Sequence, residues 1–129
     1  METVERIMSR DLLTATPDER LQDAAKRMVG RRVGAILVLE SERLAGILTE
    51  RDVLRAVGNG LDPDALVSQW MTRGPETVEP SATAEEALAL MHQGGFRHLP
   101  VTDGDTLVGI VSVRDVLRVG VQDASPRGV

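Results

Sequence analysis

The sequence contains no cysteine, only two aromatic residues and a single lysine. Without cysteine, disulfides and thiolate chemistry are excluded, and a zinc site would lack its best ligand. Trp70 and Phe96 are too few to form a stacking platform for nucleic-acid bases. No apolar run approaches the roughly 20 residues that span a bilayer, and the first residues are acidic, unlike a signal peptide. We therefore expect a cytoplasmic protein without a membrane span.

The charge balance narrows the expected partners. The sequence has 15 basic and 20 acidic side chains, which gives a formal net charge of −5 over 129 residues. The arginines are scattered along the chain, whereas general nucleic-acid binding needs clustered cations that neutralise phosphates. We therefore expect no nucleic-acid partner. A small anionic ligand held by a few arginines remains open.

One stretch of sequence is used twice. Residues 4–58 align without a gap with residues 67–121, at the constant offset of 63 residues that separates Met8 from Met71. The strongest match joins the segments 46–55 and 109–118. Self-similarity at a fixed offset is the mark of a duplicated structural unit.

Each repeat predicts the same order of elements, β-α-β-β-α. A short extended segment around Thr14 or Thr77 precedes a helix with one apolar face, and two extended runs joined by a polar turn precede a second helix that begins near Thr49 or Ser112. The apolar faces have the spacing i, i+3, i+4, i+7 and consist of Leu21, Ala24, Ala25 and Met28, and of Ala84, Ala87, Leu88 and Met91.

The duplication sets the expected domain organisation. We place the first repeat at residues 1–60 and the second at 61–129, with a linker near 58–63 and a frayed tail over 122–129. One repeat of about 60 residues buries too little surface to be stable alone. We therefore expect one integrated α/β (α+β) module, in which the repeats pack sheet to sheet with pseudo-two-fold symmetry and enclose two equivalent clefts.

The segment Gly-Ile-(Leu/Val)-(Thr/Ser)-x-Arg-Asp ends a strand and begins a helix in both repeats. One interpretation is structural: Thr49 with Asp52, and Ser112 with Asp115, form capping boxes. The other is functional. A helix start favours phosphate, and an aspartate there can accept two hydrogen bonds from the cis-diol of a ribose. The residues alone leave both interpretations open.

The duplication, the paired motifs and the segment Gly95–Val101 resemble a tandem pair of CBS domains, or Bateman module, over roughly residues 4–121. This resemblance implies a non-catalytic regulatory module that binds an adenosine-containing ligand. AMP, ADP, ATP, S-adenosylmethionine and NAD-type ligands all remain open. It also implies a homodimer that regulates another, unidentified protein.

The resemblance further implies residue roles by position. Asp52 and Asp115 would bind ribose hydroxyls, and Thr49 and Ser112 would bind ribose or phosphate oxygens. One segment of each repeat would contact adenine through its backbone, and another would line the opposite wall. These segments are Gly34, Ala35 and Ile36 with Thr14, Ala15 and Thr16 in the first repeat, and Arg97, His98 and Leu99 with Thr77, Val78 and Glu79 in the second.

Several arginines and one acidic residue bear on a ligand phosphate. Arg51 and Arg114, two residues into their helices, could neutralise a phosphate or simply be solvated. Arg31, Arg32 and Arg97 are weaker phosphate candidates. Glu79, where the first repeat has Thr16, disfavours phosphate in the second cleft.

The histidines, one proline and the tryptophan have mainly structural interpretations. His98, on a strand, is more often a core or cleft residue than a ligand contact, and His92 is expected on the surface. Two histidines without an acidic cluster predict no metal site. Pro100 predicts an edge or bent strand, and Trp70 a packing role at the entry to the second repeat.

No catalytic constellation emerges from the residues. The sequence has no nucleophile elbow and no Walker loop, and a diol-binding role suffices for the repeated aspartates. We therefore expect a binding module rather than an enzyme. The alternative to a ligand sensor is a protein-interaction module whose clefts stay unused.

Overall fold

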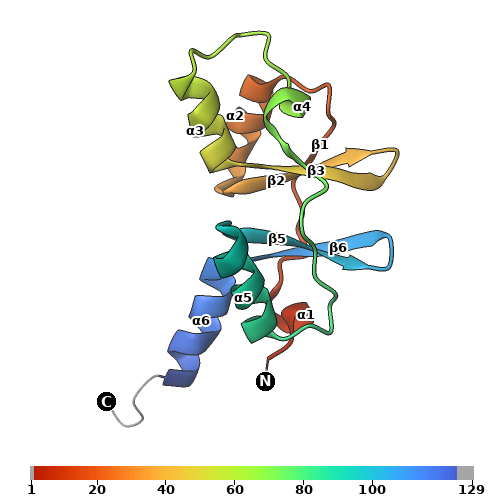
Figure 1. The fold of residues 1–129 in the computed structure, drawn as a ribbon, viewed down its shortest axis with the longest axis vertical. Coiled ribbons are helices and arrows are strands. Elements are labelled where there is room, and N and C mark those ends of the chain that lie inside the picture. Colours follow the sequence, from red (N-terminus) through yellow and green to blue (C-terminus); the bar gives the residue numbers. More distant parts are fainter. Residues whose placement is uncertain (1, 125–129) are drawn as a thin grey trace. The chain divides into compact units, whose positions relative to one another are not determined.

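The computed structural model describes residues 2–124, with side chains through residue 119, and the chain divides into two compact units (Figure 1). One unit is the continuous stretch Leu12–Pro75, here called the inserted unit. The other joins Met1–Asp11 to Glu76–Val129 and is here called the interrupted unit. Both combine helices with a sheet, which confirms the predicted α+β class.

The inserted unit is built on a four-stranded sheet in the order β1-β2-β3-β4. Strand β1 runs parallel to β2, and the other neighbours are antiparallel. Its elements in chain order are β1 (Thr14–Ala15), α2 (Leu21–Arg31), β2 (Ala35–Glu40), β3 (Arg43–Thr49), α3 (Glu50–Gly58), α4 (Val67–Trp70) and β4 (Thr72–Arg73).

The interrupted unit repeats this plan with shorter outer pairings. Its two strands pair antiparallel, while single bridges from Val78 to Val101 and from Ser9 to Ile110 stand where the other unit has β1 and β4. The extended segment expected around Thr77 is therefore a single bridge at its neighbour Val78. The elements are α1 (Val4–Ile7), α5 (Ala84–Gly94), β5 (His98–Asp103), β6 (Thr106–Ser112) and α6 (Val113–Ala124).

The C-terminal helix extends beyond the expected start of a frayed tail. Helix α6 continues to Ala124, so residues 122–124 are helical. The rest of the predicted tail, residues 125–129, lies outside the described residues. Within residues 2–124, no helix combines the length and apolar character needed to cross a bilayer.

The predicted apolar helix faces form the cores. Helix α2 buries Leu21, Ala24 and Met28, and α5 buries Ala84, Ala87 and Met91. These faces pack with the central strands into one core cluster per unit, made of small aliphatic side chains and methionine. The 3.6-residue periodicity therefore predicted both long first helices correctly.

Each unit is completed by the first residues of the other repeat. Val4, at the start of the first repeat, is fully buried in the interrupted unit, and Val67, at the start of the aligned part of the second, is fully buried in the inserted unit. Helices α1 and α4 and strand β4 were not predicted, because four-residue helices and two-residue strands show no periodicity. The compact units therefore do not coincide with the sequence repeats.

Two glycines mark where these segments cross the sheets. A Cβ on Gly46 would lie 2.7 Å from the carbonyl oxygen of Thr72 and 2.8 Å from Sδ of Met71. A Cβ on Gly109 would lie 2.5 Å from Sδ of Met8. Both glycines thus allow a methionine and the backbone beside it to lie directly on the strand.

The strand that contains Pro100 has an irregular register. Its pairing with β6 shifts between Val101 and Thr102, but β2 shifts at the equivalent place, between Val38 and Leu39, without a proline. The carbonyl of Pro100 accepts a hydrogen bond from the backbone N–H of Val78 at 3.1 Å. The missing proline N–H therefore leaves this outer pairing intact.

Candidate functional site

The start of α3 is held by a reciprocal cap. The backbone N–H of Thr49 donates to Oδ2 of Asp52 at 2.9 Å, and its hydroxyl lies 3.1 Å from the same oxygen. The N–H of Asp52 donates back to the Thr49 hydroxyl at 3.3 Å. The N–H of Glu50 bonds to the carbonyl of Gly34 at 3.0 Å, so the helix begins directly at the sheet. The capping-box interpretation is confirmed for this repeat.

The start of α6 has the same arrangement. Oδ2 of Asp115 accepts from the backbone N–H of Ser112 at 2.8 Å and lies 2.9 Å from the Ser112 hydroxyl. The Asp115 N–H donates to that hydroxyl at 3.1 Å, and the N–H of Val113 bonds to the carbonyl of Arg97 at 3.0 Å. Each cap uses Oδ2 of its aspartate, so Oδ1 remains outside the box in both units.

Neighbouring strands bring the other predicted segments toward each cap. Ala35 pairs with Thr49 across β2 and β3, and His98 pairs with Ser112 across β5 and β6. On the far side of the central strand, β1 pairs with β2 and Val78 bridges to Val101. The three predicted segments of each repeat therefore come from adjacent positions in one sheet.

Burial limits how these segments could reach a ligand. The side chains of Ile36 and Leu99 are fully buried, and Ala15, Ala35 and Val78 are nearly so. Because the backbone of Ile36 and Leu99 is as buried as their side chains, a bound molecule could contact either residue only if the atoms around it moved.

The polar members of the predicted wall segments are half-buried or exposed. Thr14, Thr77 and Gly34 are half-buried, and Glu79 is exposed. The hydroxyl of Thr16, also exposed, donates to Oδ1 of Asp18 at 2.6 Å.

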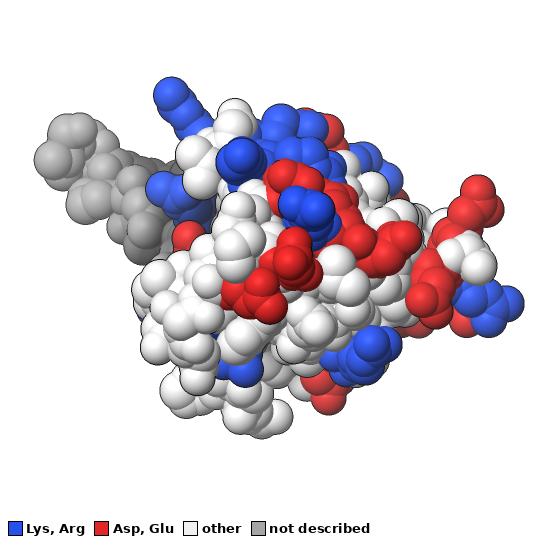
Figure 2. Space-filling model, turned by 90° about the horizontal axis from the view of Figure 1, so that it is seen from above, with Lys and Arg blue, Asp and Glu red and all other residues white. Residues whose placement is uncertain are grey.

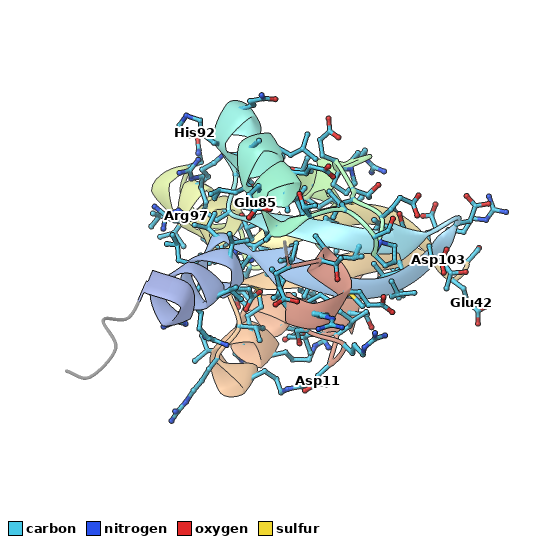
Figure 3. The ribbon with its side chains drawn as sticks, turned by 90° about the horizontal axis from the view of Figure 1, so that it is seen from below. Asp11, Glu42, Glu85, His92, Arg97 and Asp103 are labelled. Atoms are coloured by element: carbon cyan, nitrogen blue, oxygen red, sulfur yellow. The ribbon has the colours of Figure 1, made fainter. Side chains whose placement is uncertain are left out.

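The candidate arginines and histidines fall on accessible positions. Arg51 and Arg114 are exposed at the second position of α3 and α6, and Arg97 is exposed just before β5 (Figure 3). His98 is half-buried and takes part in an interaction within the fold, and His92 is exposed near the end of α5, as expected (Figure 3).

The weaker arginine candidates lie at the end of a helix. Arg31 is the last residue of α2, and Arg32 follows it in a left-handed conformation with φ of 56°.

Sequence reasoning missed the residues that support the first cap. Arg55 Nη1 donates to Oδ1 of Asp52 at 2.8 Å, and its Cζ lies 5.6 Å from the centroid of the Trp70 ring. Trp70 packs against the core of the inserted unit, so its packing role is confirmed, although it serves the first repeat. The i,i+3 spacing of aspartate and arginine indicates such a pair, but the ring comes from a segment 15 residues farther along.

A second missed contact fixes the first wall segment. Arg27 Nη2 donates to the carbonyl of Thr14 at 2.8 Å and to Oε1 of Glu19 at 2.6 Å. The second repeat has Leu90 and Ala82 at the equivalent positions, so this pair exists only once.

One face of the molecule carries charged side chains of both signs. On the face seen in Figure 2, acidic and basic side chains adjoin one another beside a large uncharged area, with no field of a single sign. Within residues 2–124, no group of three or more His, Cys, Asp or Glu side chains is placed to hold a metal ion.

The chain resembles known proteins over nearly its whole length. The family model of the CBS domain matches residues 4–59 and again residues 67–121. The CBS domain-containing protein YhcV of Bacillus subtilis is 38% identical over 117 residues, which are 90% of this chain and 84% of that protein.

Solved structures agree with this match. A candidate signal-transduction protein with CBS domains from Burkholderia ambifaria is 34% identical and superimposes with a TM-score of 0.91, covering 98% of this chain and 99% of its own. CBSX2, solved in complex with AMP, is 26% identical with a TM-score of 0.84, covering 97% and 100%. Two family matches in tandem, on two units of the same architecture, lead to one conclusion: the chain belongs to the CBS-domain family, as a pair of CBS domains.

Proposed function

We propose that this CBS pair is a non-catalytic sensor that binds an adenosine-containing ligand at the capped starts of α3 and α6. The ribose of the ligand would donate its cis-diol to Asp52 or Asp115. The observation that carries the proposal is the fixed carboxylate in each unit: the cap consumes Oδ2 and leaves Oδ1 outside the box. A pre-positioned carboxylate accepts hydroxyl donors strongly, at about 1.5–3 kcal/mol for each charge-assisted bond.

The AMP complex of CBSX2 supports the ligand class, because that protein shares 26% of its residues and the whole pair architecture with this chain. We propose AMP, ADP or ATP as the regulatory ligand, with S-adenosylmethionine and NAD-type ligands as further members of the class. Arg51 and Arg114 lie at the second helical residue, where an exposed guanidinium together with the helix start would favour a ligand phosphate.

Ligand binding would act by shifting a population. A ligand that binds one arrangement of the pair better than another favours that arrangement by its difference in affinity. The coupling to a regulated protein would be of the usual size, about 1–3 kcal/mol. The pair would act in the cytoplasm, a location that stays a prediction from the sequence.

We further propose that the pair works as a homodimer. Leu54 and Val57 on α3 are 71% and 54% exposed, and Leu117 on α6 is 55% exposed. Large apolar side chains at such exposure favour contact with another copy of the chain. Leu54→Glu with Leu117→Glu should therefore lower the sedimentation-derived mass to that of a monomer while circular dichroism stays unchanged.

A thermal-shift panel tests the ligand proposal directly. AMP, ADP, ATP, S-adenosylmethionine, NAD and GTP would be added to the wild-type chain and to Asp52→Ala and Asp115→Ala. A ligand at about 100 times its dissociation constant adds about 2.7 kcal/mol to the free energy of unfolding, a Tm increase of several degrees. We expect an increase with at least one adenosine-containing ligand, reduced in one or both variants, and no product formed from it.

The competing function is a protein-interaction module that docks a partner without any ligand. Chain freed of carried-over ligand that shows no Tm increase with any compound in the panel would favour that function. Turnover of a nucleotide would instead contradict the non-catalytic part of the proposal.

A further inference from the structure

The two helix starts differ in one contact. In the inserted unit, Arg55 Nη1 donates to Oδ1 of Asp52, and the same guanidinium lies over the Trp70 ring. In the interrupted unit, Arg118 stands three residues after Asp115 in the equivalent place. Within the described part of the chain, the Arg118 side chain makes no hydrogen bond, ion pair or ring contact.

The residue beneath the arginine explains this difference. Trp70 in α4 and Ile7 in α1 are equivalent in the duplication, and both are half-buried against their cores. An indole face attracts a guanidinium, whereas an aliphatic side chain has no such electrostatic attraction. Trp70 therefore holds Arg55 beside the first cap, and Ile7 cannot hold Arg118 in the same way.

The contact changes how many hydrogen bonds each aspartate can still accept. A carboxylate has about four acceptor positions, two on each oxygen. In both units the cap places two donors on Oδ2. Arg55 takes one position on Oδ1 of Asp52, so one remains, whereas both positions on Oδ1 of Asp115 remain. A cis-diol donates two hydrogen bonds, so Asp115 can accept both and Asp52 only one.

Burial increases the difference. The side chain of Asp52 is 7% exposed, whereas Asp115 is half-buried. No side-chain nitrogen or oxygen among the described residues is both buried and without a partner, so Oδ1 of Asp115 is not fully buried. A ligand would reach that oxygen without displacing a protein group.

We propose, on the basis of the function proposed above, that the two sites are unequal. Asp115 binds the ligand diol directly. Arg55 occupies one acceptor position of Asp52 and must leave before both diol hydroxyls can bind there, and Trp70 is the positioning residue that holds this clasp closed. The chain therefore binds its first equivalent of an adenosine-containing ligand in the interrupted unit and its second, more weakly, in the inserted unit.

Calorimetric titration of the full chain with AMP tests this order. We expect Asp52→Ala to lose only the weaker event and Asp115→Ala to lose the tighter one. In the Asp115→Ala background, Arg55→Ala should tighten the remaining event about tenfold, the combined size of one exposed ion pair and one cation–π contact. Trp70→Ile removes only the ring contact and should tighten it by a smaller factor. Arg118→Ala in the Asp52→Ala background is the matched control and should leave the tight event unchanged.

The single tryptophan provides a second measurement. Because Arg55 lies over its ring, displacement of the guanidinium should change Trp70 emission during the weaker event and leave it unchanged during the tighter one. Thermal unfolding of each variant shows that it is folded.

Each alternative result contradicts a different statement. The clasp would be overturned, and the proposed function left intact, by two binding events of equal affinity. Their dissociation constants would not change with Arg55→Ala, and Trp70 emission would stay constant throughout the titration. No binding of AMP, ADP, ATP, S-adenosylmethionine or NAD by the folded wild-type chain would overturn the proposed function, and the order of sites with it.

Discussion

Thr49 and Asp52 bond to each other in both directions, at 2.9 Å from the Thr49 N–H to Oδ2 and at 3.3 Å from the Asp52 N–H to the threonine hydroxyl. The same side chain therefore serves the fold before any ligand arrives. Ser112 and Asp115 repeat this relationship in the interrupted unit. A test of ligand binding by substitution of either aspartate must account for this structural role.

Removal of either cap should lower stability without any ligand. We expect Asp52→Ala and Asp115→Ala each to lower the free energy of unfolding by about 0.5–2 kcal/mol, the usual loss for a helix cap. Asp52→Ala should cost more, because it also leaves Arg55 without its carboxylate partner. Urea unfolding of nucleotide-free protein measures both values, and Asp23→Ala, an exposed aspartate in the first turn of α2, serves as the control. Losses no larger than that of the control would contradict the structural role of the caps.

Substitution of Gly46 or Gly109 by alanine should destabilise the fold, because each glycine lies against a segment that crosses its sheet. Gly46→Ala brings its Cβ to 2.7 Å from the backbone oxygen of Thr72, which cannot move aside freely, and we expect a loss of about 1–3 kcal/mol. At Gly109 the nearest atom is the flexible end of Met8, so the loss should be smaller. Gly58→Ala, with no atom within 4 Å of the added Cβ, is the control for both. Equal Tm values for all three variants would contradict the close approach.

Two glycines in open space should respond to the same substitution with opposite signs. Gly95 ends α5 with φ of 71°, and Gly30 lies inside α2, and an added Cβ meets nothing within 4 Å at either position. Gly95→Ala should lower the free energy of unfolding by about 1 kcal/mol because an L-residue is strained at that φ. Gly30→Ala should raise it by about 0.5–1 kcal/mol through helix propensity. Denaturant titration checks both, and a shared sign would refute the conformational argument.

The duplication makes the reverse substitution equally informative. Arg32 occupies the position equivalent to Gly95 and ends α2 with φ of 56°. We expect Arg32→Gly to raise the free energy of unfolding by up to about 1 kcal/mol, since glycine adopts this conformation without a Cβ penalty. Arg31→Gly, one residue earlier and within the helix, should lower it and serves as the control.

The first eleven residues belong to the first repeat but should stabilise mainly the interrupted unit, which contains most of the second. Val4 is fully buried in the core that contains Leu99 and Val111, and Ser9 bridges to Ile110. Deletion of residues 1–11 should therefore expose the amide hydrogens of β5 and β6 to rapid exchange while those of β2 and β3 stay protected. Hydrogen exchange measured strand by strand distinguishes this result from uniform loss of protection, which would contradict the assignment of this segment.

Sequence patterns that extend over a whole helix or motif within one repeat predicted the fold well. The apolar spacing of Leu21, Ala24 and Met28 gave the core face of α2 correctly, and the Thr-x-x-Asp motif gave the cap of α3. Contacts between distant segments had no comparable pattern. The position of Trp70 beneath Arg55 depends on how α4 packs against the inserted unit, and no local periodicity contains that information. The exchange of leading segments was missed for the same reason.

The insertion of one unit into the other also determines how the chain would respond to mechanical force. Residues 12–75 form one continuous unit, and both flanking parts of the chain belong to the other. Tension applied between the two chain ends passes through the contacts that join residues 4–9 to the core and sheet of the interrupted unit, among them the antiparallel bridge between Ser9 and Ile110. The inserted unit bears no load until those contacts break. An optical-trap extension curve should therefore show the interrupted unit unfolding first and the inserted unit unfolding afterwards, at a different force.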